Sequence, residues 1–120
     1  MKVKKIAMGI VCILMIVATM GITVLAAGSG TVSGNLSGSY AYAALKNTSD
    51  GDRYCSIAVQ ESSDYQNWTT VNASGGVLSS GNSIGVGANV SQLYVRGLGI
   101  VYHSAAPSSG VAATYTTRIR

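Results

Sequence analysis

Apolar and polar residues alternate along most of the chain after residue 27, which is the pattern of β-strands with one buried face. The strongest stretch is 93–103, where apolar or aromatic residues occupy both alternating sides. Gly97 and Gly99 interrupt one of these sides, and Arg96 interrupts the other. A strand covered on both faces has this composition. We therefore expect 93–103 to be the central strand of a small β-domain.

The remaining alternating stretches predict five or six further strands, joined by turns rich in Ser, Gly, Asn and Asp. Residues 31–45 alternate without interruption, so we interpret them as one long strand or as two strands in line with a bend. Gly75-Gly76 is expected to end the strand before it and to leave 77–78 as a short edge piece. The other predicted strands span 53–60, 68–73, 83–90 and 111–119.

This series of strands predicts an all-β fold, because no helical periodicity follows residue 27. A small antiparallel β-sandwich of about six or seven strands is the expected architecture, and a small β-barrel is the runner-up. Within 83–90, Gly85 and Gly87 lie on the side of the strand that faces away from the apolar residues. Their position indicates a face that another side chain or backbone approaches closely, or a thin face toward solvent.

The first residues have a different pattern, with Lys2, Lys4 and Lys5 followed by an apolar run to Leu25 and then by small residues. These features predict a secretory signal peptide over residues 1–26 and a single β-sandwich domain over 27–120. An uncleaved membrane anchor is the alternative, since the run is long enough to span a bilayer. We expect a secreted or cell-surface protein with no stable membrane insertion after cleavage.

Cleavage changes the charge of the protein. The chain has eight Lys and Arg against four Asp and Glu, but three of these lysines lie in the leader. Residues 27–120 retain five basic and four acidic residues, a net charge of +1. Such a balance gives no support to a nucleic-acid partner.

Candidate chemistry is sparse in residues 27–120. Cys55 is the single cysteine and is expected to be buried, with an intermolecular disulfide or a reactive thiol as alternatives. His103, the single histidine, is expected to be structural or solvent-facing, because no nucleophile motif accompanies it. Residues 46–52 are rich in oxygen ligands but lack the calcium-loop spacing, so we predict an ordinary turn. We therefore expect no enzyme activity, catalytic residue, cofactor or metal.

Aromatic residues supply the one candidate binding surface. Tyr40, Tyr42, Tyr54 and Trp68 are predicted to contribute to it, since such side chains combine a large contact area with a polar tip. The alternative is that the tyrosines replace the absent Phe as core and rim material and that Trp68 plugs the core or its edge.

The layout of a leader followed by a short β-domain rich in Gly, Ser and Tyr is similar to that of many small exported proteins of Gram-positive bacteria, compact sandwich bacteriocins included. The first hypothesis is a non-enzymatic binding or cell-envelope-associated module. The alternative is a secreted bacteriocin-like antimicrobial or toxin-like effector. The expected partner is a protein or envelope component, and a homo-oligomer through an edge strand or Cys55 is also considered.

Overall fold

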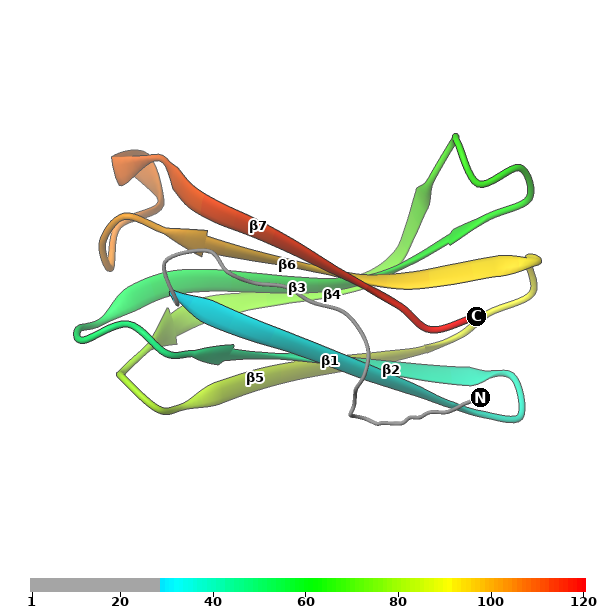
Figure 1. Ribbon diagram of the computed structural model, residues 1–120, viewed down its shortest axis with the longest axis horizontal. Coiled ribbons are helices and arrows are strands. Elements are labelled where there is room, and N and C mark those ends of the chain that lie inside the picture. The colour runs from blue at the N-terminus through cyan, green and yellow to red at the C-terminus, as the bar shows by residue number, and fades with distance from the viewer. Residues whose placement is uncertain (1–28) are drawn as a thin grey trace.

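The computed structural model describes residues 29–120, which form two antiparallel β-sheets packed face to face (Figure 1). The three-stranded sheet has the order β1-β2-β5, and the four-stranded sheet has the order β4-β3-β6-β7. The strands are β1 (Gly30–Ser37), β2 (Tyr40–Asn47), β3 (Arg53–Ser62), β4 (Thr69–Leu78), β5 (Ser83–Asn89), β6 (Tyr94–Tyr102) and β7 (Val111–Arg118). A short 3-10 turn, η2 (Pro107–Ser109), lies between the last two strands.

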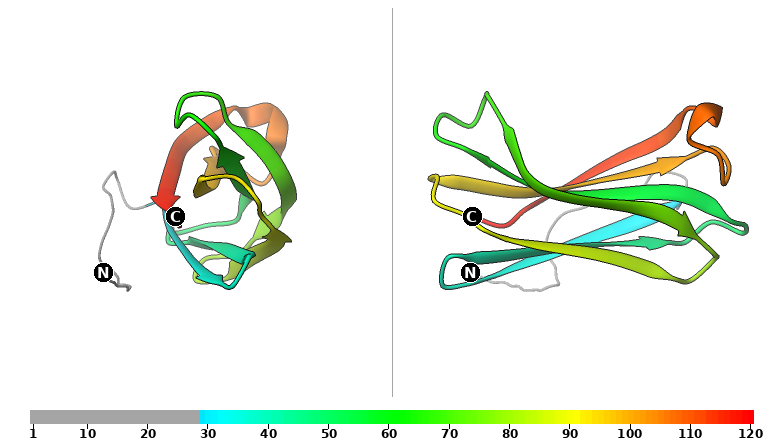
Figure 2. Two further views of the ribbon diagram at one scale, coloured as in Figure 1. Left: turned by 90° about the vertical axis from the view of Figure 1, so that its right-hand side faces the viewer. Right: turned by 180° about the vertical axis from the view of Figure 1, so that it is seen from behind.

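The edges of the two sheets lie beside each other on both sides of the sandwich, as the end-on view in Figure 2 shows. On one side, β4 lies along β5, and the side-chain amide of Asn72 donates to the Gly87 carbonyl oxygen at 3.0 Å. On the other side, β1 lies along β7. The β-sandwich prediction and its strand number are confirmed, whereas the barrel alternative is wrong because the strand ladders form two separate sheets.

The predicted leader, 1–26, lies outside the described residues. Within residues 29–120, no helix is long and apolar enough to cross a membrane.

The prediction for 31–45 is wrong, because this stretch folds back on itself as the β1-β2 hairpin. Ser37 pairs with Tyr40, so Gly38 and Ser39 form the turn, and Gly38 has the positive φ of 61° that glycine adopts readily. Paired residues of a hairpin face the same side of the sheet. Tyr40 and Tyr42 therefore point away from the core instead of sharing the buried side of Leu36.

The predicted break at Gly75-Gly76 is also wrong, because β4 runs through both glycines to Leu78. Gly75 pairs with Ser56 and Gly76 pairs with Cys55, so the ladder with β3 continues. The absence of a side chain at Gly75 leaves room for the Tyr54 hydroxyl, which lies 2.7 Å from the position a Cβ would take. The glycine here accommodates a cross-strand ring instead of ending the strand.

The predicted central strand is confirmed as an interior strand, with β6 between β3 and β7. Its odd-numbered residues, Val95 to Val101, face the core and are buried. Its even-numbered residues are only half-buried on the outer face, so the expectation of a strand covered on both faces is wrong. Two aromatic residues on that face, Tyr94 and Tyr102, pack edge-on against Tyr65 and Tyr54.

The core is narrow because small residues line the contact between β2 and β6. A Cβ at Gly97 would lie 2.9 Å from the Ala43 Cβ, and one at Gly99 would lie 3.1 Å from a Leu45 methyl group. Leu45 also reaches to 3.3 Å from the corresponding position at Gly30, so one side chain fills the space between three strands. The contact between β2 and β6 therefore runs through glycine and alanine, and Leu45 is fully buried beside it.

We predict that Gly97→Ala destabilises the fold by roughly 1–3 kcal/mol, because neither Ala43 nor the backbone around it can move away cheaply. For a domain of this size, each kcal/mol lowers the Tm by roughly 4–8 °C. Gly76→Ala is the matched control, since nothing lies within 4 Å of its Cβ position. It is expected to leave the Tm unchanged or to raise it slightly. An equal fall in Tm for both variants in thermal melts would contradict the close contact of Gly97 with Ala43.

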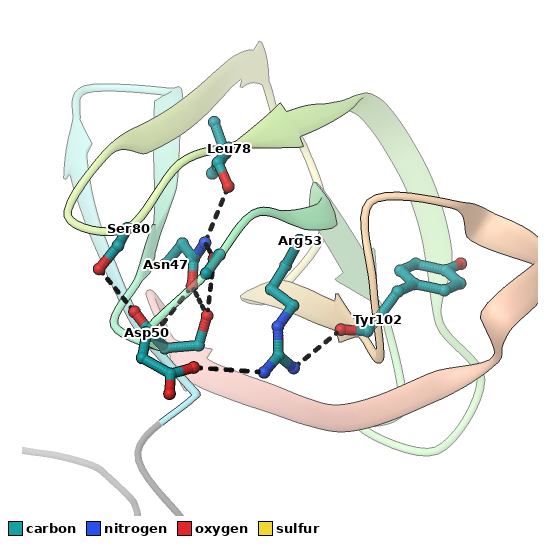
Figure 3. Close-up of polar contacts among 8 residues, drawn as sticks. Asn47, Asp50, Arg53, Leu78, Ser80 and Tyr102 are labelled. Atoms are coloured by element: carbon teal, nitrogen blue, oxygen red, sulfur yellow. Dashed lines mark hydrogen bonds and ion pairs between the residues drawn. The ribbon is translucent and has the colours of Figure 1, made fainter.

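A buried asparagine fastens one end of the sandwich (Figure 3). The Asn47 amide nitrogen donates to the carbonyl oxygens of Gly51 and Leu78 at 2.9 and 2.8 Å, and its oxygen accepts from the backbone N–H and hydroxyl of Ser49. These bonds join the end of β2 to the following loop and to the end of β4. In the same loop, the Asp50 carboxylate lies 3.9 Å from the Arg53 guanidinium.

We predict that Asn47→Ala lowers the free energy of unfolding by about 1–3 kcal/mol, because it removes the side-chain amide that donates to the part-buried carbonyl oxygens of Gly51 and Leu78. Asn35→Ala is the control, since Asn35 is exposed and its side chain makes no hydrogen bond within the described chain. That variant is expected to stay within about 0.5 kcal/mol of the parent protein. Equal denaturation midpoints for the two variants in urea would refute the fastening role of Asn47.

Candidate functional site

The four aromatic residues predicted to bind lie on two opposite faces of the sandwich. Tyr40 and Tyr42 lie on the outer face of the three-stranded sheet, on β2. Tyr54 and Trp68 lie on the outer face of the four-stranded sheet, near opposite ends of β3. The structure therefore brings together only the first pair, and it places the other two in separate surroundings.

The rings of Tyr40 and Tyr42 lie across β5, with the hydroxyl end of each over a glycine. A Cβ at Gly87 would overlap the Tyr40 ring, and one at Gly85 would overlap the Tyr42 ring. The exposed fractions of the two tyrosines, 48% and 42%, fit rings with one face on the sheet and one toward solvent. Of the two alternatives for the face of these glycines, the closely approached one is correct, and the approaching groups are the two phenol rings.

Small polar side chains surround the two rings. In the register of the hairpin, Asn35 lies opposite Tyr42 and Ser37 lies opposite Tyr40. Lys46 is the one charged residue on this side of β2. We call this surface the tyrosine face, and it consists of Tyr40, Tyr42, Gly85 and Gly87 with the exposed polar rim Thr31, Ser33, Asn35, Ser37, Lys46, Ser83 and Asn89.

Tyr54 is half-buried and packs edge-on against Tyr102, with ring centroids 5.3 Å apart. Its hydroxyl lies over Gly75. Both contacts hold the ring to the sheet near the start of β3. Tyr115, by contrast, is buried in the core, so the interpretation of the tyrosines as core material is right for that residue.

Trp68 lies outside the core and packs against a guanidinium group. The Arg96 Cζ lies 4.1 Å from the centroid of the Trp68 ring, and the Arg96 Nε donates to the Gln60 side-chain oxygen at 2.8 Å. Tyr65 meets the Trp68 ring edge-on at 5.4 Å. Burial lowers the pKa of Arg96, while the nearby Tyr65 acts in the opposite direction. The tryptophan thus forms one wall of a mixed aromatic and basic cluster.

A shallow hollow lies beside this cluster, and Arg118 on β7 lies on its far side. Arg96 and Arg118 are directly opposite in the β6-β7 register. We call it the arginine hollow, and its lining comprises Tyr65, Trp68, Val95, Arg96, Thr116, Thr117 and Arg118. Sequence reasoning missed both arginines as site residues, although Arg96 interrupts an otherwise apolar side of its strand.

The loop before Trp68 is organised by Asp64. Its carboxylate accepts hydrogen bonds from the backbone N–H groups of Gln66 and Asn67, from the Asn67 amide and from the Ser62 hydroxyl. These bonds, the backbone ones first, lower the pKa of Asp64 far below its ordinary value of 3.8. They also hold Tyr65 at a positive φ of 64°, which is uncommon for a residue with a side chain.

We predict that this loop loosens in acid. Since the pKa of Asp64 is depressed in the folded state, the stabilisation by its carboxylate is present above about pH 4 and is lost as the pH falls below that value. Asp64→Asn should therefore lower the Tm at pH 7 and have a smaller effect near pH 2. Thermal melts at both pH values, with Trp68 fluorescence as the local probe, measure the difference.

Asp52→Asn is the control, because Asp52 is exposed and its carboxylate makes no hydrogen bond in the described part of the chain. The same dependence on pH in both variants would rule out a specific role of Asp64.

The remaining candidates lie apart from these faces. Cys55 is fully buried, as predicted, and burial raises the pKa of its thiol, so a disulfide with a second copy would require the core to open. His103 is exposed, and its imidazole makes no hydrogen bond within residues 29–120. No group of three or more His, Cys, Asp or Glu side chains suited to a metal ion comes together in that range.

Comparisons with protein-family models, with curated proteins and with solved structures found no match. The assignment of a function therefore depends on the geometry of the tyrosine face and of the arginine hollow.

Proposed function

We propose that the protein is an exported, non-enzymatic binding module that attaches to a polysaccharide chain of the cell envelope through the tyrosine face. The observation that carries the proposal is the placement of Tyr40 and Tyr42 across the sheet, over Gly87 and Gly85. Two neighbouring rings that lie along the sheet form one continuous aromatic surface, whereas rings that stand up from it are separate contacts.

The spacing of the two rings suits an extended ligand. Tyr40 and Tyr42 are two residues apart on one strand, so their rings repeat at about 7 Å along it. Both rings lean over β5 in the same direction, each reaching the glycine diagonally across from it. A pyranose ring has an apolar C–H face that can rest on a phenol ring, and a chain of such units places successive faces along a line.

The rim supports a ligand rich in hydroxyl groups. Exposed Ser, Thr and Asn side chains surround the rings, and Lys46 is the one charge among the rim residues. Surfaces that combine Tyr with Ser, Asn and Gly bind through rigid aromatic contact area and adaptable hydrogen bonds. Because the rings already rest over the two glycines, a ligand that binds them in this position costs less side-chain freedom.

The test is retention of the purified protein on insoluble polysaccharides, with cellulose, chitin and peptidoglycan sacculi as the probes. We expect Tyr42→Ala to weaken binding roughly tenfold, since an aromatic contact residue at the centre of a binding face is worth about that much. Gly85→Ala keeps both tyrosines but lifts the Tyr42 ring from the sheet, and it should weaken binding to a similar extent.

Tyr54→Ala is the matched control, because it removes a tyrosine from the opposite sheet. Melting curves and circular dichroism establish that each variant is folded. Retention that depends on Tyr54 and not on Tyr42 would contradict the proposal, as would the absence of retention on all three polysaccharides.

A further inference from the structure

We propose that the arginine hollow is a binding site for an oxyanion, a phosphate or carboxylate group, which Arg96 and Arg118 hold together. The arginine hollow lies on the opposite sheet from the tyrosine face, so this proposal does not depend on polysaccharide binding and is tested separately.

The first argument is an uncompensated pair of like charges. Arg96 and Arg118 face each other across β6 and β7, and like charges in directly opposite positions destabilise a sheet. The single ion pair within residues 29–120 joins Arg53 and Asp50. A local rule broken without compensation in the fold is a feature of functional sites. An anion between the two guanidinium groups supplies the missing compensation.

The acidic residues of the described chain either bind other groups or lie far from the two arginines. Asp64 holds its own loop, and one Glu61 carboxylate oxygen accepts from the backbone N–H groups of Ser91 and Gln92. Asp50 and Asp52 belong to the loop at the opposite end of β3 (Figure 1). None of these four carboxylates forms an ion pair with Arg96 or Arg118, which leaves both guanidinium groups open to an external anion.

The second argument is that Arg96 is held in place before any ligand arrives. Its guanidinium plane rests on Trp68, and its Nε is bonded to Gln60, whose amide nitrogen donates in turn to the Thr70 hydroxyl at 3.0 Å. The two terminal nitrogens of Arg96 make no hydrogen bond in the described residues. A fixed guanidinium with free terminal N–H groups suits a two-point contact with an oxyanion.

The rest of the hollow fits the same ligand. Arg118 is exposed and supplies a second fork of donors, and Thr116, two residues earlier on β7, lines the hollow as well. Tyr65 is 54% exposed beside them and offers a surface for the part of the ligand that carries the anion. The site thus combines positive charge with an aromatic wall, which favours an anion attached to a larger molecule over a free ion.

Trp68 is the only tryptophan of the chain, so its fluorescence reports binding directly. The purified protein is titrated with inorganic phosphate, polyphosphate, polygalacturonate and uncharged dextran at constant ionic strength. We expect saturable changes with the anionic polymers, a weaker change with phosphate and none with dextran. A larger response to polyphosphate than to polygalacturonate assigns a phosphate group, and the reverse assigns a carboxylate.

Arg118→Gln should weaken anion binding about tenfold. The affinity of Arg118→Lys should lie between those of the parent protein and Arg118→Gln, because lysine keeps the charge but lacks the forked donors of a guanidinium group. Arg53→Gln removes the same charge at the opposite end of β3, outside both candidate sites, and should have no effect. Arg118 is exposed, so its variants are expected to fold, and circular dichroism checks this. Equal losses for Arg118→Gln and Arg53→Gln, or no saturable change with any anion, would overturn the proposal.

Discussion

The close contact of β2 with β6 is the constraint on which the rest of the structure depends. Ala43 and Leu45 pack into the space that Gly97 and Gly99 leave open, and Leu45 also reaches Gly30 on β1. The interior is therefore thin, and the core residues other than Tyr115 are aliphatic or cysteine. A thin interior has little space for rings. This limit explains why the remaining tyrosines and Trp68 lie on the outer faces, where they are available for binding.

The alternation of the sequence is enough to predict an all-β sandwich, because a period of two residues specifies strands whatever their order. The alternation does not show whether the odd-numbered or the even-numbered residues of a given strand are buried. A hairpin with a two-residue turn reverses the parity of the buried side, and between Ser37 and Tyr40 this reversal occurs inside an uninterrupted alternation. Gly75 shows a second limit, since the same residue type that ends many strands here makes space for the Tyr54 ring.

The two candidate sites differ in how far the sequence reveals them. Tyr40 and Tyr42 share a face by simple alternation, and Gly85 and Gly87 indicate a closely approached surface. Only the pairing of β2 with β5, which the sequence does not reveal, brings the tyrosines and the glycines together. The meeting of Arg96 with Arg118 depends on the β6-β7 register, which includes an irregularity next to Tyr102. The contact of Trp68 with Arg96 depends on a loop held by Asp64, and neither follows from local pattern.

The positions of the sheet edges favour binding through the faces. Where β4 runs along β5, the Asn72 amide occupies the Gly87 carbonyl that an added strand would use, and β1 lies along β7 on the other side. The faces, by contrast, carry side chains that the core does not require. Exposed face positions such as Tyr40 and Arg118 can therefore change with little loss of stability, because the contact between β2 and β6 lies beneath them. A sandwich of this kind leaves the outer faces of both sheets free to vary while its narrow interior stays the same.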